Sequence, residues 1–261
     1  MKNSFSKALN INKGDVITLV GAGGKTSILK ILAEEINKNV IITTTTHIQT
    51  LNDFSENKII SENYGQISDD IVKIRKESNK KIFITSKIVK KLEDGKYKLK
   101  GFDPDWVDRI HFKFSDEIII VEGDGAAMKS IKAPAAYEPV VPKSTSKLLA
   151  VMGLKDLGKE INKTNCHRVD KIKKLTSSSV IDKELIIKII TDEKAYGYYS
   201  DKVKDFIVVL NQLGSCDFAN ALELGKKLIK LGIEKVILAD TNKNNPIIKI
   251  LNRGDINERN K

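Results

Sequence analysis

A glycine-rich segment near the N-terminus has the residue types that bind phosphate. It runs Gly21-Ala22-Gly23-Gly24-Lys25-Thr26-Ser27, between an apolar run and an amphipathic one. Glycines let backbone N–H groups turn toward phosphate oxygens, and a following helix adds its dipole. Lys25 would contact the outer phosphates and assist catalysis, while Thr26 would offer a hydroxyl to Mg²⁺. We expect residues 21–27 to bind a nucleoside triphosphate.

The segment departs from the full phosphate-loop pattern G-x-x-x-x-G-K-[ST]. Leu19 stands where that pattern has its first glycine, so the loop is shortened to G-x-x-G-K-T. Such shortened loops occur in ligases of the Mur type. A dinucleotide loop fits less well, because G-x-G-x-x-G needs glycine at Thr26. A tight strand-to-helix turn with an incidental lysine is the other interpretation.

Two carboxylates follow another apolar run. Residues 117–121 read EIIIV, and Glu122-Gly123-Asp124-Gly125 comes next. Ligands of open α/β sheets bind at the carboxyl ends of strands. Alternate residues of an extended chain point the same way, so Glu122 and Asp124 should face one site. We expect both to bind Mg²⁺ or to position and deprotonate the attacking group. The alternative is a polar turn in which the acids cap the next segment.

Two further strand ends offer polar side chains. Thr43 to Thr46 end a β-branched run, and we expect Thr45 to contact the nucleotide, although threonine is also a good strand former. Asn211 ends the run FIVVLN, where many GTPases carry a base-reading N-K-x-D motif. Gln212-Leu213-Gly214 follows instead, so Asn211 remains a candidate nucleotide contact without support for guanine.

Other polar positions have weaker signals. Lys132-Ala133-Pro134 and residues 138–142 form a proline-stiffened loop that would bind substrate or serve as a surface connection. Arg168 would meet a phosphate or end a solvated helix. His47 has no partner histidine, which favours a capping or surface role.

The elements that must position these residues alternate between strands and helices. Apolar runs predict strands at 15–20, 40–46, 81–85, 117–121, 147–152, 206–211 and 235–239. Amphipathic spacing predicts helices at 25–37, 66–78, 104–113, 167–176, 182–191 and 217–231. Continuous apolar strands between helices are typical of parallel sheets covered on both faces. We expect an α/β, doubly wound, mostly parallel sheet with helices on both faces, like that of P-loop NTPases.

Domain boundaries have no clear mark in the sequence. We expect a single α/β domain over residues 1–261, with a possible helical insertion at 155–205. A small hairpin is expected around Gly95, and residues 253–261 look frayed.

Composition excludes several classes of protein. With 41% hydrophobic and 30% charged residues, the chain is neither a disordered tail nor a fibre. No run approaches the roughly 20 apolar residues of a membrane helix, and no secretory signal is visible. Cys166 and Cys216 lack the paired spacing of a zinc site or disulfide framework. We expect a cytoplasmic protein that does not bind membranes.

The net charge of +11 would attract polyanions. The lysines are scattered among acids, however, and the aromatic content of 6% offers few surfaces on which bases could stack. Nucleic acid is therefore not an expected partner.

Taken together, the motifs resemble the YqeC family, whose members are described as selenium-dependent hydroxylase accessory or selenium cofactor biosynthesis proteins. The resemblance rests on LVGAGGKTS at 19–27, TTTTHI at 43–48, VEGDGA at 121–126 and KAPAAYEPVVP at 132–142. It implies a P-loop nucleotide-binding protein that helps to mature selenium-dependent molybdenum hydroxylases. Gly123 and Gln212 depart from the family pattern, where alanine and lysine are expected.

The resulting hypothesis is a Mg²⁺-dependent NTPase or phosphoryl-transfer enzyme that uses ATP or GTP. Its expected partners are the nucleoside triphosphate and a selenium-dependent molybdenum hydroxylase or its cofactor. Two alternatives stay open: a nucleotide-gated cofactor chaperone or carrier, and a Mur-like ATP-dependent ligase.

Overall fold

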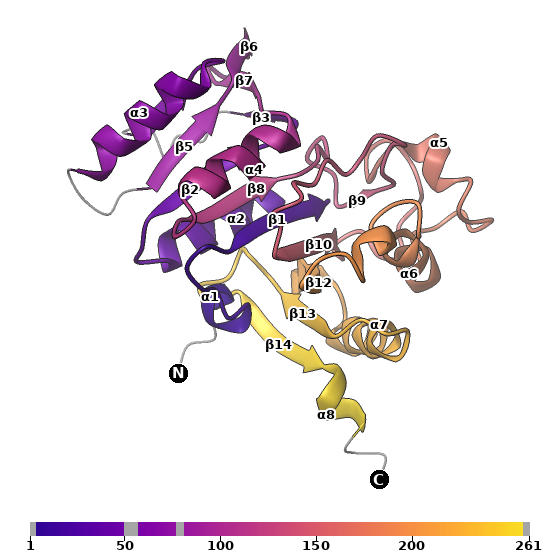
Figure 1. Cartoon of the computed structure of the whole chain (residues 1–261). Coiled ribbons are helices and arrows are strands. Elements are labelled where there is room, and N and C mark those ends of the chain that lie inside the picture. The colour runs from indigo at the N-terminus through magenta and orange to yellow at the C-terminus, as the bar shows by residue number, and fades with distance from the viewer. Residues whose placement is uncertain (1–3, 50–56, 77–80, 258–261) are drawn as a thin grey trace.

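The protein is an α/β structure built on one large sheet (Figure 1). This computed structural model describes residues 4–49, 57–76 and 81–257. The sheet has nine strands in the order β14-β13-β12-β10-β1-β8-β2-β5-β4. All neighbours are parallel except β13 and β14. The expectation of a mostly parallel α/β sheet is confirmed.

The strands of this sheet are β1 (Val16–Gly21), β2 (Val40–Thr44), β4 (Lys58–Ile60), β5 (Lys81–Thr85), β8 (Ile118–Glu122), β10 (Lys147–Gly153), β12 (Asp205–Asn211), β13 (Lys235–Ala239) and β14 (Ile247–Asn252). The helices are α1 (Phe5–Ala8), α2 (Lys25–Glu35), α3 (Tyr64–Arg75), α4 (Pro104–Lys113), α5 (Val169–Ile172), α6 (Lys183–Thr191), α7 (Phe218–Lys230) and α8 (Arg253–Asn257). Short 3₁₀ turns lie at Gly197–Tyr199 and Leu213–Ser215.

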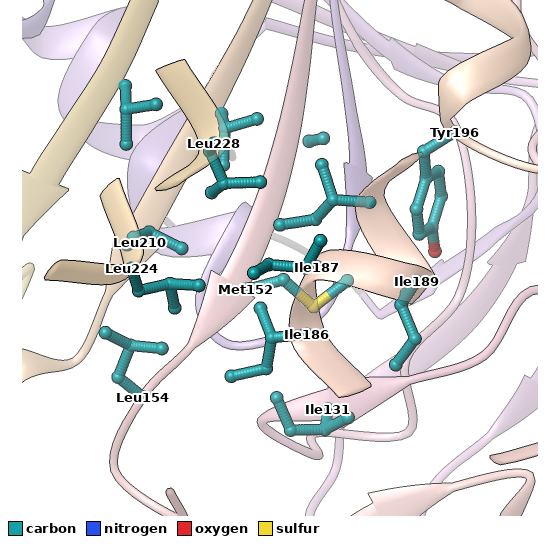
Figure 2. Packing of buried hydrophobic residues seen from close by; sticks show 14 of the residues in the cluster. Ile131, Met152, Leu154, Ile186, Ile187, Ile189, Tyr196, Leu210, Leu224 and Leu228 are labelled. Atoms are coloured by element: carbon teal, nitrogen blue, oxygen red, sulfur yellow. The ribbon is translucent and has the colours of Figure 1, made fainter. Parts of the chain in front are cut away.

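Three apolar clusters hold helices against the sheet. Alternate residues of β1 divide between its two faces: Ile17 and Leu19 pack with α1 and α2, whereas Val20 packs with α6 and α7. The third cluster joins α3 and α4 to β2, β5 and β8. Figure 2 shows the cluster beside α6 and α7, with Met152 of β10 among leucines and isoleucines of both helices. Both faces of the sheet are therefore covered, which explains the uniformly apolar central strands.

Two small sheets extend from this framework. β3 (His47–Gln49), β7 (Tyr97–Lys100) and β6 (Lys87–Lys91) form an antiparallel sheet in the order β3-β7-β6. The predicted hairpin around Gly95 joins β6 to β7. β9 (Ile131–Lys132) and β11 (Cys166–His167) pair in parallel.

Some elements differ from the sequence prediction. The helix expected at 167–176 is only α5, because Cys166 and His167 belong to β11 and Arg168 has a left-handed backbone with φ 63°. Residues 253–257 form α8 rather than a frayed end, and 258–261 lie outside the described residues. The helix predicted at 66–78 begins earlier, at Tyr64. Its predicted end, at 77–78, also lies outside the described residues.

The segment 155–205 lies between β10 and β12 and contains β11, α5 and α6. Its status as an insertion into a single domain stays a prediction. Within the described part of the chain, no helix combines the length and apolar character needed to cross a lipid bilayer.

Candidate functional site

The glycine-rich segment forms the turn between β1 and α2. Gly23 and Gly24 have φ values of 82° and 118°, a backbone region that L side chains rarely adopt. A Cβ at Gly23 would lie 2.3 Å from the backbone nitrogen of Gly153, and one at Gly24 would lie 2.3 Å from Asn211 Nδ2. Both positions therefore require glycine, because the turn is packed against the ends of β10 and β12.

The first three amides of the loop bind protein atoms. Gly21 N–H donates to both carboxylate oxygens of Asp124 at 3.0 Å. Ala22 N–H donates to Val151 O at 2.8 Å, and Gly23 N–H donates to Lys129 O at 3.0 Å. These bonds shape the loop. They also mean that the expected phosphate cradle does not draw on these three amides in this arrangement.

The next four amides belong to the start of α2. Gly24 is its N-cap and supplies no side-chain cap. The N–H groups of Gly24, Lys25, Thr26 and Ser27 therefore have no intrahelical acceptor, which is the general property of a helix N-terminus. Such uncapped amides, with the positive end of the helix dipole, favour an anion.

Lys25 lies beside the loop with its ammonium turned inward. Its Nζ donates to Gly21 O at 2.7 Å and lies 3.2 Å from Asp124 Oδ1. The side chain is only 4% exposed. The sequence expectation that Lys25 and Asp124 lie on the same edge of the sheet agrees with this geometry.

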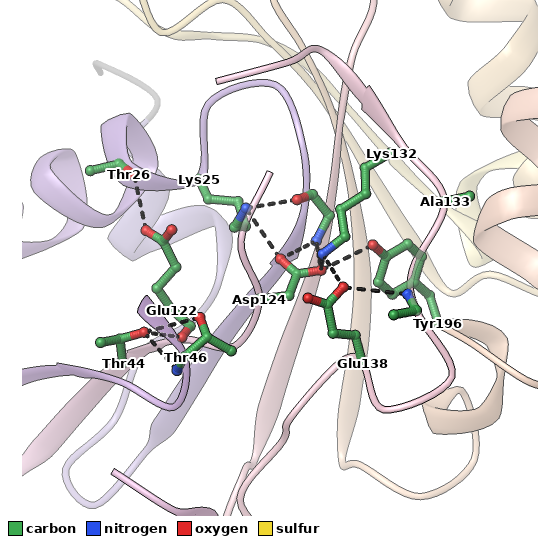
Figure 3. A network of polar contacts seen from close by, with 12 residues as sticks. Lys25, Thr26, Thr44, Thr46, Glu122, Asp124, Lys132, Ala133, Glu138 and Tyr196 are labelled. Carbon is green, nitrogen blue, oxygen red and sulfur yellow. Dashed lines mark hydrogen bonds and ion pairs between the residues drawn. The ribbon is translucent and has the colours of Figure 1, made fainter. Parts of the chain in front are cut away.

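Asp124 is the centre of a buried ionic network (Figure 3). Besides Gly21 and Lys25, it binds Lys132 Nζ at 2.8 Å and accepts a hydrogen bond from Tyr196 Oη at 3.0 Å. Lys132 and Asp124 are both fully buried. Because a buried charge is tolerated only when it is paired, these contacts fix the acidic turn against the loop.

The network continues through Glu138 to Arg168. Lys132 Nζ lies 2.6 Å from Glu138 Oε2, and Arg168 Nη2 donates to Glu138 Oε1 at 2.9 Å. Burial alone would raise the pKa of Glu138, but the hydrogen bonds from Arg168 and Lys132 outweigh it and lower this pKa to about 2. Arg168 therefore lies at the far end of the network, where its guanidinium binds a carboxylate of the protein.

Glu122 lies next to Thr26, which belongs to the first turn of α2. Thr26 Oγ1 donates to Glu122 Oε2 at 2.9 Å, as Figure 3 shows. Burial raises the pKa of Glu122, and the charge of nearby Lys25 opposes this shift. Glu122 is thus a buried acid with a hydroxyl neighbour and no lysine within ion-pair distance in the described chain.

The oxygen atoms here fit a magnesium ion that also binds phosphate. Octahedral Mg²⁺ with ligands at about 2.0–2.1 Å places adjacent oxygens about 2.9 Å apart, the separation of Thr26 Oγ1 and Glu122 Oε2. Among the described residues, no group of three or more His, Cys, Asp or Glu side chains could hold a metal alone. A metal ion at Thr26 and Glu122 would therefore have to complete its shell with phosphate and water, as Mg²⁺ usually does.

Thr44, the last residue of β2, and the next residue, Thr45, bind main-chain carbonyl groups around the candidate site. Thr44 Oγ1 donates to Glu122 O at 2.8 Å, and Thr45 N–H donates to the same carbonyl at 3.1 Å. Thr45 Oγ1 donates to Val140 O at 2.6 Å, in the proline-rich loop. The structure thus gives Thr45 two contacts that position Glu122 and that loop.

Asn211 holds the glycine turn through hydrogen bonds of its side-chain amide. Its Nδ2 donates to Gly23 O at 2.8 Å, and its Oδ1 accepts from Thr241 N–H at 3.1 Å. The side chain is fully buried. We expected a nucleotide contact here; the geometry instead gives Asn211 the role of holding the loop and the end of β13 together.

Comparison with known proteins gives a family. The family model described as "YqeC protein" matches residues 17–170, more than half of the chain. The chain belongs to the YqeC family. The matched region includes the glycine-rich loop, both acids and the network as far as Arg168, while Tyr196 and Asn211 lie beyond it.

One curated relative is similar in sequence. It is the protein from Escherichia coli (strain K12) described as "Uncharacterized protein YqeC", 33% identical over 161 residues. The alignment covers 59% of this chain and 57% of the relative, so the chain spans less than two thirds of that protein. No solved structure matches the chain.

Sequence reasoning missed two members of this candidate site. Lys132 was visible only as part of the proline-stiffened loop, and its pairing with Asp124 needs the third dimension. Tyr196 carries no sequence signal, since no motif distinguishes it from the neighbouring Tyr198 and Tyr199. His47 lies outside the site, on the small antiparallel sheet.

Proposed function

We propose that this chain is a Mg²⁺-dependent nucleoside-triphosphate-binding protein that hydrolyses the nucleotide or transfers its terminal phosphoryl group. The observation that carries the proposal is the uncapped start of α2, directly after a buried parallel strand, with Lys25, Thr26 and Glu122 around it. On this proposal the fold is a doubly wound sheet like that of P-loop NTPases.

Each residue then has a defined task. The amides of residues 24–27 would donate to phosphate oxygens. Lys25 would stabilise charge on the outer phosphates, and Asp124 would hold its ammonium at the mouth of the loop. Glu122, whose pKa is raised by burial, would accept a proton from the attacking group.

The metal would be held by the oxygens of Thr26 and Glu122. Mg²⁺ bound there would neutralise charge on the terminal phosphates. The choice between ATP and GTP rests on experiment, since Asn211 is bound to the loop rather than directed at a base.

The proposed cellular role is to aid the maturation of selenium-dependent molybdenum hydroxylases in the cytoplasm. Its support is the family resemblance, and the proposed partners are such a hydroxylase or its cofactor. The reaction that the nucleotide drives would then be a step in building or delivering that cofactor.

Calorimetric titration with ATP and GTP, with and without Mg²⁺, tests the site. Lys25→Ala should weaken binding by about tenfold or more, because a charge-assisted contact to phosphate is lost. Lys38→Ala is the matched control, since Lys38 is exposed beyond the other end of α2. Thermal unfolding of each variant verifies the fold. Equal affinities for wild type and the Lys25 variant would remove the assignment.

A nucleotide-gated carrier is the second candidate. The observation that favours it is the network from Asp124 through Glu138 to Arg168, which connects the loop to the segment 155–205. A carrier predicts slow turnover that accelerates when a partner hydroxylase is added. Fast turnover with a small acceptor alone contradicts it.

A further inference from the structure

The small sheet of β3, β7 and β6 has one strongly basic face. Paired residues on neighbouring antiparallel strands share a face. Lys100 pairs with His47 on one side and Lys87 on the other, and Lys98 pairs likewise with Gln49 and Lys90. We call this surface the lysine face. It consists of His47, Gln49, Lys87, Lys90, Lys98 and Lys100.

A β-bulge brings the fourth lysine to this face. The register of β6 shifts between Ile88 and Lys90, so Val89 is the extra residue. In a regular strand Lys90 would pair with Tyr97 and lie on the opposite face, which also carries Leu99. That face turns inward at Leu99, which is 1% exposed and belongs to the core cluster with α2.

The lysine face works against the stability of its own sheet. It sets Lys87 opposite Lys100 and Lys90 opposite Lys98, and like charges directly opposite each other destabilise a sheet. Lys87 pairs with Glu62 at 3.0 Å. Lys90, Lys98 and Lys100 have no ion pair with any carboxylate of the described chain.

The same cations act on their neutral neighbour. Burial lowers the pKa of His47, and the charges of Lys98 and Lys100 lower it further. Among the described carboxylates, only Glu62 forms an ion pair with the lysine face. An external anion would relieve repulsion among the lysines that the described residues do not pair.

We propose that the lysine face docks an acidic surface of a partner protein. Charge complementarity is the first argument. The second is the bulge residue Val89 of the edge strand β6, which is 46% exposed and offers apolar contact. The described lysine face carries no Phe, Tyr or Trp ring for base stacking and no arginine for bidentate phosphate contacts, which disfavours nucleic acid.

The position of the lysine face relative to the candidate site gives a reason for a partner to dock there. His47 directly follows Thr46, whose carbonyl accepts from Gly101 N–H at 2.6 Å, so β3 starts and β7 ends at the carboxyl edge of the main sheet. Figure 1 shows β3, β6 and β7 beyond the end of β5. A protein docked there would lie on the same edge as Glu122. The proposal does not depend on which ligand the site takes.

The test measures binding of fluorescent poly-L-glutamate at low ionic strength. Lys90→Glu/Lys98→Glu should weaken binding about fivefold or more, since two contacts become repulsive. Because glutamate then opposes glutamate, the variant keeps the repulsion within the sheet. Lys226→Glu/Lys230→Glu on α7 changes the net charge equally at two exposed positions and should weaken binding less than twofold.

Three outcomes would overturn the proposal: equal weakening by both double variants, no binding by wild type, or oligo(dT) binding more tightly than poly-L-glutamate and depending on Lys90 and Lys98. MgATP titration of the same variants separates this surface from the proposed nucleotide site. Unchanged nucleotide affinity is expected, and unchanged unfolding midpoints show that both variants are folded.

Discussion

At the scale of single residues, the candidate site contains two buried acids whose electrostatic surroundings differ. Asp124 is paired with two lysines, a tyrosine and a backbone amide. Glu122 is equally buried, but its near partner is the neutral hydroxyl of Thr26. Two carboxylates separated by one glycine therefore have different roles: Asp124 organises the loop, and Glu122 retains the capacity to bind a cation or take a proton.

Glu122→Gln should separate stability from function. Burial raises the pKa of Glu122, so the stability that its neutral form contributes is full below about pH 4.5 and is lost as pH rises through the raised value. Glutamine removes this loss, so at neutral pH the unfolding midpoint should stay equal or rise. Mg²⁺-dependent nucleotide binding should fall about tenfold or more.

Chemical unfolding and nucleotide titration of the same preparation provide the two readouts. Glu93→Gln, on the exposed hairpin, is the control for a loss of charge. A Glu122 variant that binds Mg²⁺ nucleotide as tightly as wild type would show that this carboxylate has no part in the site.

At the scale of elements, the β1–α2 turn depends on backbone freedom and close packing. Gly24→Ala would force a side chain into a left-handed conformation and against Asn211, whose amide holds the Gly23 carbonyl. We expect a loss of about 3 kcal/mol, combining backbone strain of about 1–2 kcal/mol with a disturbed buried hydrogen bond.

Gly95→Ala is the matched comparison. Gly95 also has a positive φ, of 80°, but its Cβ would meet nothing within 4 Å. Only the strain of about 1–2 kcal/mol should then remain. Urea unfolding of both variants measures the difference, and equal losses would mean that contact with Asn211 costs nothing.

The elements also show what the sequence could predict. The central strands were predicted within two residues because they are apolar on both faces, and α4 matched its prediction over 104–113 with proline at its first turn. β14 was missed because its outward side chains interrupt the apolar run.

The candidate site was predictable only in part. The sequence predicts Glu122, Asp124 and Lys25 at the carboxyl ends of parallel strands, and the structure places these strands, β1 and β8, side by side. The hydrogen bonds made by the amides of Gly21, Ala22 and Gly23 could not be predicted from the sequence, since Val151 and Lys129 come from distant segments. The same holds for Lys132 and Tyr196.

At the scale of the whole molecule, one ionic network joins the N-terminal half to the segment 155–205. Glu138 is the anion that links Lys132 to Arg168 in this network. Tyr196 adds a second contact from that segment to Asp124. The two regions are therefore coupled by buried charge as well as by apolar packing.

This coupling predicts a specific acid sensitivity. The pKa of Glu138 is lowered from 4.5 to about 2, so the stability it contributes is present above about pH 4.5 and is lost as pH falls toward 2. The shift corresponds to about 3 kcal/mol. Glu138→Gln should lose about that much at neutral pH and show a flatter decline between pH 5 and 2.

Unfolding free energies measured across this pH range, for wild type and the Glu138 variant, test this predicted acid sensitivity. Glu93→Gln again serves as the exposed control and should keep the wild-type profile. Parallel profiles for wild type and the Glu138 variant would contradict the assignment of the depressed pKa.

Asp124 is shared by groups from both regions, and this sharing has an energetic consequence. Any phosphate that draws the ammonium of Lys25 away from Asp124 leaves that carboxylate to Lys132, Tyr196 and the amide of Gly21. Those remaining bonds then carry more of its charge and strengthen. Loading of the loop would thus strengthen the hydrogen bond from Tyr196, a residue more than 150 positions downstream of Lys25 in the sequence.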